Sequence, residues 1–598
     1  MRRLLSPLGR VRDRVRSDVD ADPYLGYILV LAFVLGAFWF WHLAPNFATR
    51  DEMDRILDPM VAFGVFQSDP SIASLQAGIE WGRVPFGATF YLYALALVPV
   101  VVVAALTGQM DIFDTFADPR WPFSAFGTYE AWHATPEWVW LTVVSIARLF
   151  TVLFAVGSVY LTYRIGTEIR DRATGRLAAV LLTVTWGFLT ISHEGGEDMP
   201  AMFFVLLALY LLLGYVRTGS DRRFYAASAA GGAAIAFKLT AFPVIVAVGA
   251  AWLLRAREAD DWRDALVQPT LLVAGALFGL AVILLGFPTF LVGGTDQILT
   301  RFFEGSGERA DWATGPDAPI WWWFLRGYFS GMSLPLFLAS CAGVVGGVYQ
   351  LATNREESSY IALVLVALGT YVLLFSQWHD FRVHHLLPTF PLLAVLVALG
   401  LNRLLRDAPR AGVALTVLLL LSTSVYAAVG VVGYATMPRD EAVDWLDENA
   451  EDGDTLELYR VHMQDTAVPH SIDVNHRYEN RESHVACPEY VEITYRDLLY
   501  LKDGTYYRNG APQKTYVRNM LNGEYGYEIV AEFGPRPPNF VPERASPGSL
   551  VDLLPYGVIP HTDQYADEQE LEPNQYTAIL APTGPNSCDA DRGIPFYN

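Results

Sequence analysis

Long apolar runs recur along this chain between residues 24 and 434, and they constrain the fold more than any other feature. A membrane-spanning helix needs about 20 consecutive, mainly apolar residues. With 598 residues, 53% of them hydrophobic, and a mean hydropathy of +0.27, the chain is predicted to be a polytopic α-helical membrane protein. The runs lie near residues 24–43, 89–107, 138–163, 177–192, 200–216, 224–254, 269–292, 329–350, 358–376, 386–402 and 410–434.

The run at residues 224–254 is too long for one crossing. As a single helix it would extend roughly 46 Å, at a rise of about 1.5 Å per residue. Lys238 interrupts it near its middle. We therefore predict two helices that meet at Lys238 and place the lysine at the tip of a tight hairpin.

Arginine clusters orient the predicted helices. The N-terminal arm is rich in arginine, and so are the loops at residues 164–176, 217–223, 255–263 and 403–410. The positive-inside rule places such segments in the cytoplasm. All four loops share that side with the N-terminus only if the run at 89–107 does not cross. We therefore expect about 11 transmembrane helices, plus interfacial helices in a long extracytoplasmic loop.

These signals divide the chain into three parts. Residues 1–23 are predicted to be a basic cytoplasmic arm, 24–437 a transmembrane domain with its outer loop at 44–137, and 438–598 an extracytoplasmic soluble domain. In the last part, alternation at 490–495 and 526–531 predicts strands. Residues 440–448 predict a short amphipathic helix. We expect a compact α/β domain there.

Three consecutive tryptophans, Trp321, Trp322 and Trp323, precede the apolar run at 329–350. Tryptophan is enriched at membrane–water interfaces because its ring is amphipathic. We expect these three residues to belong to an interfacial aromatic belt.

The chain is strongly acidic. Its net charge of −21 and pI near 4.9 argue against nucleic acid as a partner. Most of the charge lies from Arg439 onward, and the only lysines are Lys238, Lys502 and Lys514. An acidic surface with little lysine suits concentrated salt, which screens self-repulsion. This composition indicates a halophilic, archaeal source.

The three cysteines differ in their surroundings. Cys341 falls in an apolar run, whereas Cys487 and Cys588 lie in the polar C-terminal part. The latter two would form a disulfide if that part faces an oxidising exterior. The sequence leaves a disulfide and two free thiols open, because it does not show whether their geometry permits a bond.

Four polar segments that lie far apart in the sequence meet at the extracytoplasmic surface in this topology. Each segment alone has an ordinary explanation as an interfacial loop, a helix cap or a snorkelling lysine. Together they predict a polar cavity, because charges at a membrane boundary are costly. The segments supply Asp51 and Glu52 after the first helix, Asp198 at a helix start, Lys238 at the hairpin tip, and His379, Arg382 and His385 before a Leu-Leu-Pro sequence.

The predicted cavity contains both cations and carboxylates. Arg382 and Lys238 suit a bound phosphate, since arginine donates as a fork and lysine acts as a point charge. A carboxylate beside them suits a general base that deprotonates a hydroxyl. A phosphate leaving group and an activated hydroxyl describe glycosyl transfer from a lipid phosphate. Asp51, Glu52 and Asp198 are also candidate ligands for Mg²⁺ or Mn²⁺, although their spacing does not require a metal.

The order of these groups resembles the GT-C superfamily of membrane glycosyltransferases, in particular the dolichyl-phosphate-mannose protein mannosyltransferases and the aminoarabinose transferases. The resemblance covers residues 24–434. It rests on the Asp-Glu pair after the first helix, the Pro-containing apolar segment at 84–92, Ala147-Arg148-Leu149, an acid in the second large outer loop, the hairpin lysine, and an arginine shortly before Leu-Leu-Pro.

The resemblance implies that Asp51 is the catalytic base, with Glu52 beside it, and that Asp198, Lys238 and Arg382 match substrate-binding positions. It also implies a lipid-phosphate sugar donor and inversion at the anomeric carbon. Two departures are visible. His384 and His385 stand where relatives carry an aromatic residue. The C-terminal part lacks the Trp-Trp-Asp-Tyr-Gly motif of oligosaccharyltransferases, so transfer of a whole glycan to asparagine is not predicted.

We therefore expect a multi-pass cell-membrane enzyme that transfers a sugar from a polyprenyl- or dolichyl-phosphate donor to a hydroxyl of a glycan, lipid or protein. Lys238 and Arg382, with His379 and His385 nearby, are expected to bind the donor. Two alternatives stay open: a lipid-linked glycan flippase or transporter, and a non-catalytic glycolipid-binding protein. The long outer loop and the absence of repeat symmetry speak against a transporter.

Overall fold

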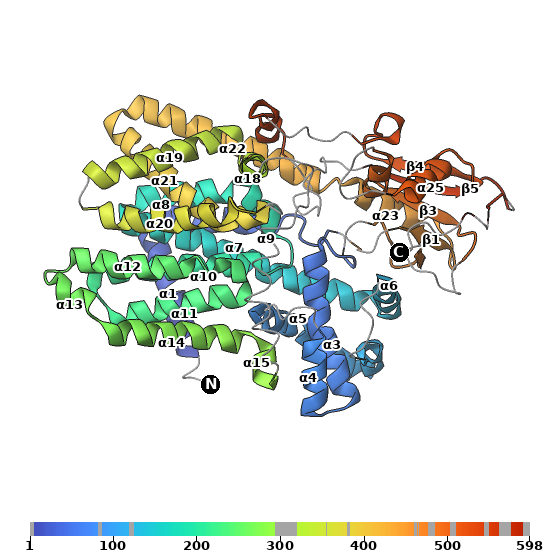
Figure 1. The fold of residues 1–598 in the computed structure, drawn as a ribbon, viewed down its shortest axis with the longest axis horizontal. Coiled ribbons are helices and arrows are strands. Elements are labelled where there is room, and N and C mark those ends of the chain that lie inside the picture. The colour runs from blue at the N-terminus through green and yellow to red at the C-terminus, as the bar shows by residue number, and fades with distance from the viewer. Residues whose placement is uncertain are drawn as a thin grey trace.

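The computed structural model of the chain is mostly helical and carries a small sheet near its C-terminus (Figure 1). A large apolar core lies between the long helices. The structure describes residues 5–42, 44–81, 87–118, 125–293, 320–353, 356–378, 383–459, 463, 466–476, 485–502, 510–542, 549–560, 576–585, 587–589 and 592.

Within these residues, nine helices are long and apolar enough to cross a membrane, or up to 11 if each of two bent pairs forms one span. The bent pairs are α1 (Leu5–Ala21) with α2 (Pro23–Gly36), at 117°, and α8 (Arg172–Thr183) with α9 (Trp186–Ser192), at 66°. The prediction of a polytopic helical membrane protein is confirmed. The other long helices are α5 (Gly87–Thr107), α7 (Glu137–Ile169), α10 (Asp198–Thr218), α12 (Val244–Glu258), α14 (Pro269–Gly286), α19 (Leu334–Thr353), α20 (Ser358–Phe375), α21 (Phe390–Asp407) and α22 (Pro409–Tyr434).

The hairpin predicted around Lys238 is confirmed. Helix α11 (Asp221–Phe237) ends with Lys238 as its C-terminal cap, and the backbone there is extended. A short 3-10 turn, η2 (Leu239–Ala241), follows and leads into α12. Pro243 supports this break because proline lacks the N–H that would continue a helical hydrogen-bond ladder.

Helix α5 is the element that we expected to remain at the outer interface. Its length and composition also admit a crossing. It packs against α3 (Arg50–Ser68), which runs across the direction of α10, α11 and α14 in Figure 1. Just beyond α5, the Met110 carbonyl accepts a hydrogen bond from Gln67 Nε2 of α3 at 2.9 Å. The interfacial placement of α5 stays a prediction.

Arginines from the predicted cytoplasmic loops meet at one end of the bundle. Arg217 Nη1 lies 2.7 Å from Glu168 Oε2, and Arg170 Nη2 lies 2.5 Å from Glu357 Oε2. Asp18 of α1 joins them through Arg164, at 2.6 Å. Within the described part of the N-terminal arm, Asp18 therefore makes the ion pair that holds α1 against these loops.

The C-terminal part contains a mixed five-stranded sheet in the order β2-β1-β3-β5-β4. The central strand β3 (Tyr490–Thr494) pairs parallel with β1 (Thr455–Leu458) and antiparallel with β5 (Thr577–Pro582). These elements confirm the predicted strands and the predicted short helix. The remaining elements are β2 (Asp473–His476), β4 (Tyr527–Phe533), α23 (Pro438–Asn449), which follows α22 directly, and α25 (Ala511–Leu521).

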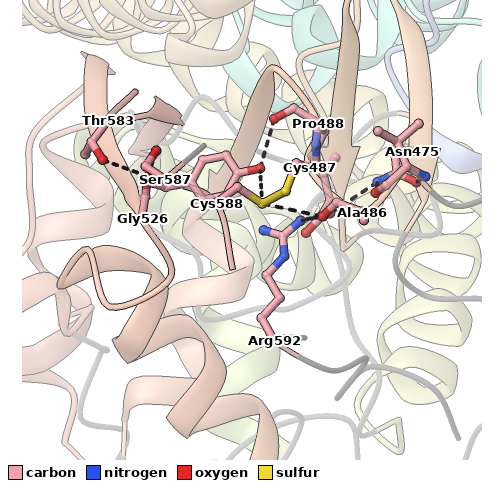
Figure 2. Close-up of a disulfide and its surroundings, with 12 residues drawn as sticks. Asn475, Ala486, Cys487, Pro488, Gly526, Thr583, Ser587, Cys588 and Arg592 are labelled. Carbon is pink, nitrogen blue, oxygen red and sulfur yellow. Dashed lines mark hydrogen bonds and ion pairs between the residues drawn. A yellow bond between two sulfur atoms is a disulfide. The ribbon is translucent and has the colours of Figure 1, made fainter. Parts of the chain in front are cut away.

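Cys487 and Cys588 form a disulfide with their Cα atoms 5.8 Å apart (Figure 2). The bond ties the segment before β3 to the segment after β5. The Tyr527 hydroxyl donates to the carbonyl of Pro488, the residue after Cys487, at 2.9 Å. The structure thus decides between the alternatives that the sequence left open, and Cys341 is an exposed free thiol.

Residues 549–560 return from the sheet to the membrane helices and pack against α18 (Ile320–Gly331). Trp322 Nε1 donates to the Ser549 carbonyl at 3.1 Å. Trp322 and Trp323 are buried in a small aromatic core with Tyr556, whereas Trp321 is 43% exposed. The expectation of an aromatic belt was therefore wrong for Trp322 and Trp323, because the returning segment covers them.

Candidate functional site

Asp51 and Glu52 occupy the first turn of α3 and lie in different environments. Thr49 caps this helix, with its hydroxyl oxygen accepting from the Glu52 backbone N–H at 3.1 Å. Neighbouring helical residues point about 100° apart around the axis, so one turn can present one side chain to solvent and bury the next. The Asp51 side chain is 41% exposed, whereas the Glu52 side chain is 0% exposed.

Glu52 is held by four donors from three parts of the chain. Arg148 of α7 donates from Nε to Oε1 at 2.7 Å and from Nη2 to Oε2 at 2.8 Å. The backbone N–H groups of Ala48 and Gly195 donate to the two oxygens at 2.7 and 2.8 Å. Glycine is required at 195, since a Cβ atom there would lie 2.8 Å from Glu52 Oε1. Glu52 thus joins α3, α7 and the loop before α10.

Arg55, one turn after Asp51, connects α3 to the start of α10. Its Nη2 lies 3.9 Å from Asp51 Oδ1, and its Nε lies 3.3 Å from Glu197 Oε2. Arg55 and Glu197 are almost fully buried. Glu197 is the N-terminal cap residue of α10, so the next residue, Asp198, begins that helix.

Asp198 pairs with Lys238 across two elements. Lys238 Nζ lies 2.5 Å from Asp198 Oδ1, and both side chains are mostly buried. They lie at a narrow pocket between α10, η2 and η3 (Val383–Thr389), with a cavity volume of about 10 Å³. The pocket is lined by Asp198, Ala201, Met202, Val205, Lys238, Thr240, Ala241, His384, His385 and Pro388.

The structure brings together most of the predicted site. Contacts link Asp51 through Arg55 and Glu197 to the segment that carries Asp198, and Asp198 contacts Lys238. His385 lines the same pocket, with its ring centroid 5.2 Å from that of Trp378. His379 and Arg382 lie outside the described residues.

The candidate metal ligands, Asp51, Glu52 and Asp198, are not arranged around one metal site. In the described part of the chain, no group of three or more His, Cys, Asp or Glu side chains is arranged to hold a metal ion. Both oxygens of Glu52 accept from Arg148 and from backbone N–H groups. Asp198 is paired with Lys238 instead.

Burial shifts the protonation of two groups beside this site. Burial raises the pKa of Asp58 on α3 to about 8; Arg55 opposes this shift, and Asp54 and Glu197 add to it. Burial also lowers the pKa of His193 to about 3, with the Arg148 charge acting in the same direction. At neutral pH, His193 is therefore neutral and Asp58 is mainly protonated.

The loop before α10 is fixed from a second side. The Tyr434 hydroxyl at the end of α22 donates to Glu194 Oε1 at 2.8 Å and also contacts His42 Nε2. Since α23 follows α22, this contact lies where the sheet-bearing part joins the bundle.

Three residues of this charge network had no role in our prediction: Arg55, Arg148 and Glu197. The sequence pattern includes Arg148 only as part of the Ala147-Arg148-Leu149 segment. Its signal was an arginine inside a long apolar run, because such a charge is costly without a partner. Its partner lies 96 positions earlier, and no local pattern identifies it.

Comparison with known proteins agrees with the resemblance expected from the sequence. Residues 143–287 match the family model of dolichyl-phosphate-mannose-protein mannosyltransferases. The match confirms the resemblance to GT-C glycosyltransferases. The matched segment includes Arg148, Glu197, Asp198 and Lys238. No protein of curated function matches the chain.

Several solved structures are similar to the chain at low sequence identity. ArnT from Cupriavidus metallidurans bound to undecaprenyl phosphate has 14% identity and a TM-score of 0.45, covering 71% of this chain and 73% of that one. The apo oligosaccharyltransferase from Archaeoglobus fulgidus has 13% identity and a TM-score of 0.42, covering 85% of this chain and 69% of that one.

Proposed function

We propose that this chain transfers a sugar from a polyprenyl- or dolichyl-phosphate donor to a hydroxyl acceptor, with inversion at the anomeric carbon. The observation that carries the proposal is the linked set of charges from Asp51 through Arg55 and Glu197 to Asp198 and Lys238. The match of residues 143–287 to a mannosyltransferase family supports the reaction class.

Asp51 is the proposed general base. It is much more exposed than Glu52 and Asp198, so an acceptor hydroxyl can approach it. Asp51 takes the hydroxyl proton while the acceptor oxygen attacks the anomeric carbon. The bond between that carbon and the phosphate oxygen breaks at the same time. The Arg55 guanidinium lies 3.9 Å from the Asp51 carboxylate.

Lys238 is proposed to stabilise the departing phosphate. A fixed cation at the place where negative charge develops lowers the barrier without reorganisation during the reaction. Asp198 holds the ammonium group at the pocket wall. His385 lines the same pocket, and we propose Arg382 and His379 as further donor-binding residues because they directly precede η3.

Glu52 is proposed to position the site rather than to exchange protons. Both of its oxygens are occupied and it is fully buried, so its carboxylate does not face an acceptor. Its bonds to Arg148 and to the Gly195 N–H fix the loop that precedes Asp198.

We propose that the site faces the extracytoplasmic side of the cell membrane. The arginine-rich end of the bundle suits the cytoplasm. The Cys487–Cys588 disulfide suits an oxidising compartment. In Figure 1 the sheet and α3 lie together at the end opposite α13 (Trp262–Leu266), which follows one of the arginine-rich helix ends.

The test is transfer by the purified full chain in lipid nanodiscs, using labelled dolichyl-phosphate mannose or glucose and a panel of hydroxyl acceptors. Asp51→Asn should reduce transfer by roughly 10²-fold or more without changing the melting midpoint, since general-base catalysis contributes about 10²–10⁴. Asp114→Asn changes an exposed carboxylate near α3 and should leave transfer unchanged. Near-normal turnover by Asp51→Asn would refute the assignment of Asp51 as the general base. Lipid translocation without transfer would favour a flippase.

A further inference from the structure

Residues 549–560, which return from the sheet to the bundle, present an apolar outer side. They include η7 (Val551–Leu553) and η8 (Pro555–Gly557). Asp552 is the only charged residue among them, although the C-terminal part of the chain is strongly acidic. Exposed apolar side chains gathered in this way mark a contact with a membrane or with another protein. The aliphatic residues concerned are 42–69% exposed: Leu550, Val551, Leu554, Val558 and Ile559.

The inner side of this segment packs against the membrane helices. Its buried side chains share a small core with α18, formed by Trp322, Trp323, Phe329, Leu553 and Tyr556. The Tyr426 hydroxyl of α22 donates to the Tyr556 carbonyl at 2.6 Å. Gly557 approaches the start of α19 so closely that a Cβ atom there would lie 2.9 Å from Leu334 Cβ. In Figure 1 the segment is the dark red coil beside α22 and α18.

The contact with Tyr426 sets the depth of the segment along the bundle. Tyr426 lies about two turns, or roughly 12 Å, before the last residue of α22, Tyr434. It lies about 24 Å along the helix axis from Arg410, at the arginine-rich end of α22. The hydrocarbon layer of a bilayer is about 30 Å thick. With Arg410 at one edge of that layer, Tyr426 and the backbone bonded to it still lie inside the layer.

The apolar side of the segment continues the apolar surface of two neighbouring helices. Val425 and Val429 lie on either side of Tyr426 on α22, and both are exposed. Leu338 is exposed on α19, one turn after the residue that Gly557 approaches. Both helices are long and apolar enough to cross the membrane, so these side chains face lipid. The lipid that covers them also reaches the outer side of residues 549–560.

The backbone of the segment meets the main requirement of an apolar environment, in which an unpaired N–H or C=O group is costly. The Ser549 carbonyl accepts from Trp322 Nε1 at 3.1 Å, and Tyr426 binds the Tyr556 carbonyl. Pro555 has no N–H group to satisfy. Backbone N–H groups donate to carbonyls of the same segment at 2.8–3.3 Å from Leu553, Leu554, Gly557, Val558 and Ile559.

We propose that residues 549–560 form a membrane-contact segment, which inserts Leu554, Val558 and Ile559 among the acyl chains of the leaflet at the sheet-bearing end of the bundle. Asp552 then lies at the level of the head groups, where a charge costs little. Its carboxylate accepts from the Ser549 backbone N–H at 3.1 Å and from the Ser549 hydroxyl at 2.7 Å. The segment thus attaches the C-terminal part of the chain to the bilayer, whether or not the chain transfers a sugar.

The experiment places spin labels on single cysteines of the full chain in lipid nanodiscs. Every variant carries Cys341→Ser, because Cys341 is an exposed free thiol, and labelling without reductant keeps the disulfide closed. Leu554→Cys and Val558→Cys test the segment at two exposed positions. Val429→Cys on α22 is the lipid-facing reference. Val530→Cys, at an exposed valine of β4 in the sheet, is the water-facing control.

The measurement is the ratio of collisions with molecular oxygen, which concentrates in the hydrocarbon layer, to collisions with a water-soluble nickel chelate. The ratio at Leu554 and Val558 should match that at Val429 and exceed that at Val530 several-fold. A ratio at both positions as low as at Val530 would overturn the proposal, because the segment would then lie in water. Protection of both labels from oxygen and from the chelate would also overturn it, because a second copy of the chain would then cover the segment.

Discussion

The guanidinium of Arg148 donates to both carboxylate oxygens of Glu52, at 2.7 and 2.8 Å, and neither side chain is exposed. This bidentate pair joins the middle of α7 to the first turn of α3. The residue before Glu52, Asp51, lies in a different environment, because 41% of its side chain is exposed. Two adjacent acids therefore differ in environment: Glu52 joins two helices, and Asp51 is open to solvent.

Breaking the Glu52–Arg148 pair should destabilise the protein. Glu52→Gln should lower the free energy of unfolding by about 3–5 kcal/mol, because it leaves a buried guanidinium without its counter-charge. Thermal melting in detergent measures the effect. The double variant Glu52→Leu with Arg148→Met should lose less than the sum of the two single changes. The control is Glu137→Gln, which changes an exposed acid on α7, the helix that carries Arg148. A stable Glu52→Gln protein without transfer activity would instead make Glu52 catalytic.

Removing the ammonium group of Lys238 should impair transfer more than substrate binding. Lys238→Met should lower kcat by roughly 10²–10³-fold, as the loss of one charge-stabilising donor does in other enzymes. Lys238→Arg should recover part of the rate because it keeps the charge. Steady-state kinetics with a labelled donor measure kcat and KM. Lys514→Met, on α25, should not affect kcat. An unchanged kcat in Lys238→Met would remove Lys238 from the mechanism.

Asp58 should make stability fall as pH rises. Burial raises its pKa from 3.8 to about 8, against the opposing Arg55 charge. Between these values the folded carboxyl stays protonated while the unfolded one is ionised. The folded state then binds more protons, so stability falls with rising pH by up to about 1.4 kcal/mol per pH unit. Melting midpoints between about pH 5 and 8 should show this slope in wild type and in Asp111→Asn, and a smaller one in Asp58→Asn. Equal slopes in wild type, Asp111→Asn and Asp58→Asn would contradict this role of Asp58.

The disulfide should be detectable by thiol labelling. Alkylation of the denatured, unreduced protein should modify Cys341 alone, and prior reduction should expose Cys487 and Cys588 as well. Replacing both bonded cysteines by serine should destabilise the sheet by about 2–4 kcal/mol, because a long loop is no longer closed in the unfolded chain. Cys341→Ser should have no such effect. Labelling of three thiols before reduction would show that the bond does not form in the cell.

Local patterns were sufficient for much of the fold. The apolar runs identified the long helices because a bilayer sets a minimum length for a spanning segment. Lys238 identified the break between α11 and α12, and alternation identified β3 and β4. The same reasoning failed for Trp322 and Trp323, since their burial depends on a segment more than 200 positions later in the chain. Local patterns also did not decide whether α5 crosses the membrane; that prediction depends on the positive-inside rule alone.

The sequence by itself determined which segments are helices or strands, and it determined that Asp198 and Lys238 lie at helix ends. Segment length, periodicity and helix-breaking residues are local properties. Only the tertiary structure decided that 41% of the Asp51 side chain is exposed and that Glu52 is bound by Arg148. The physical reason is that packing sets the rotation of each helix about its axis, and a rotation of about 100° exchanges a solvent-facing residue with the next one.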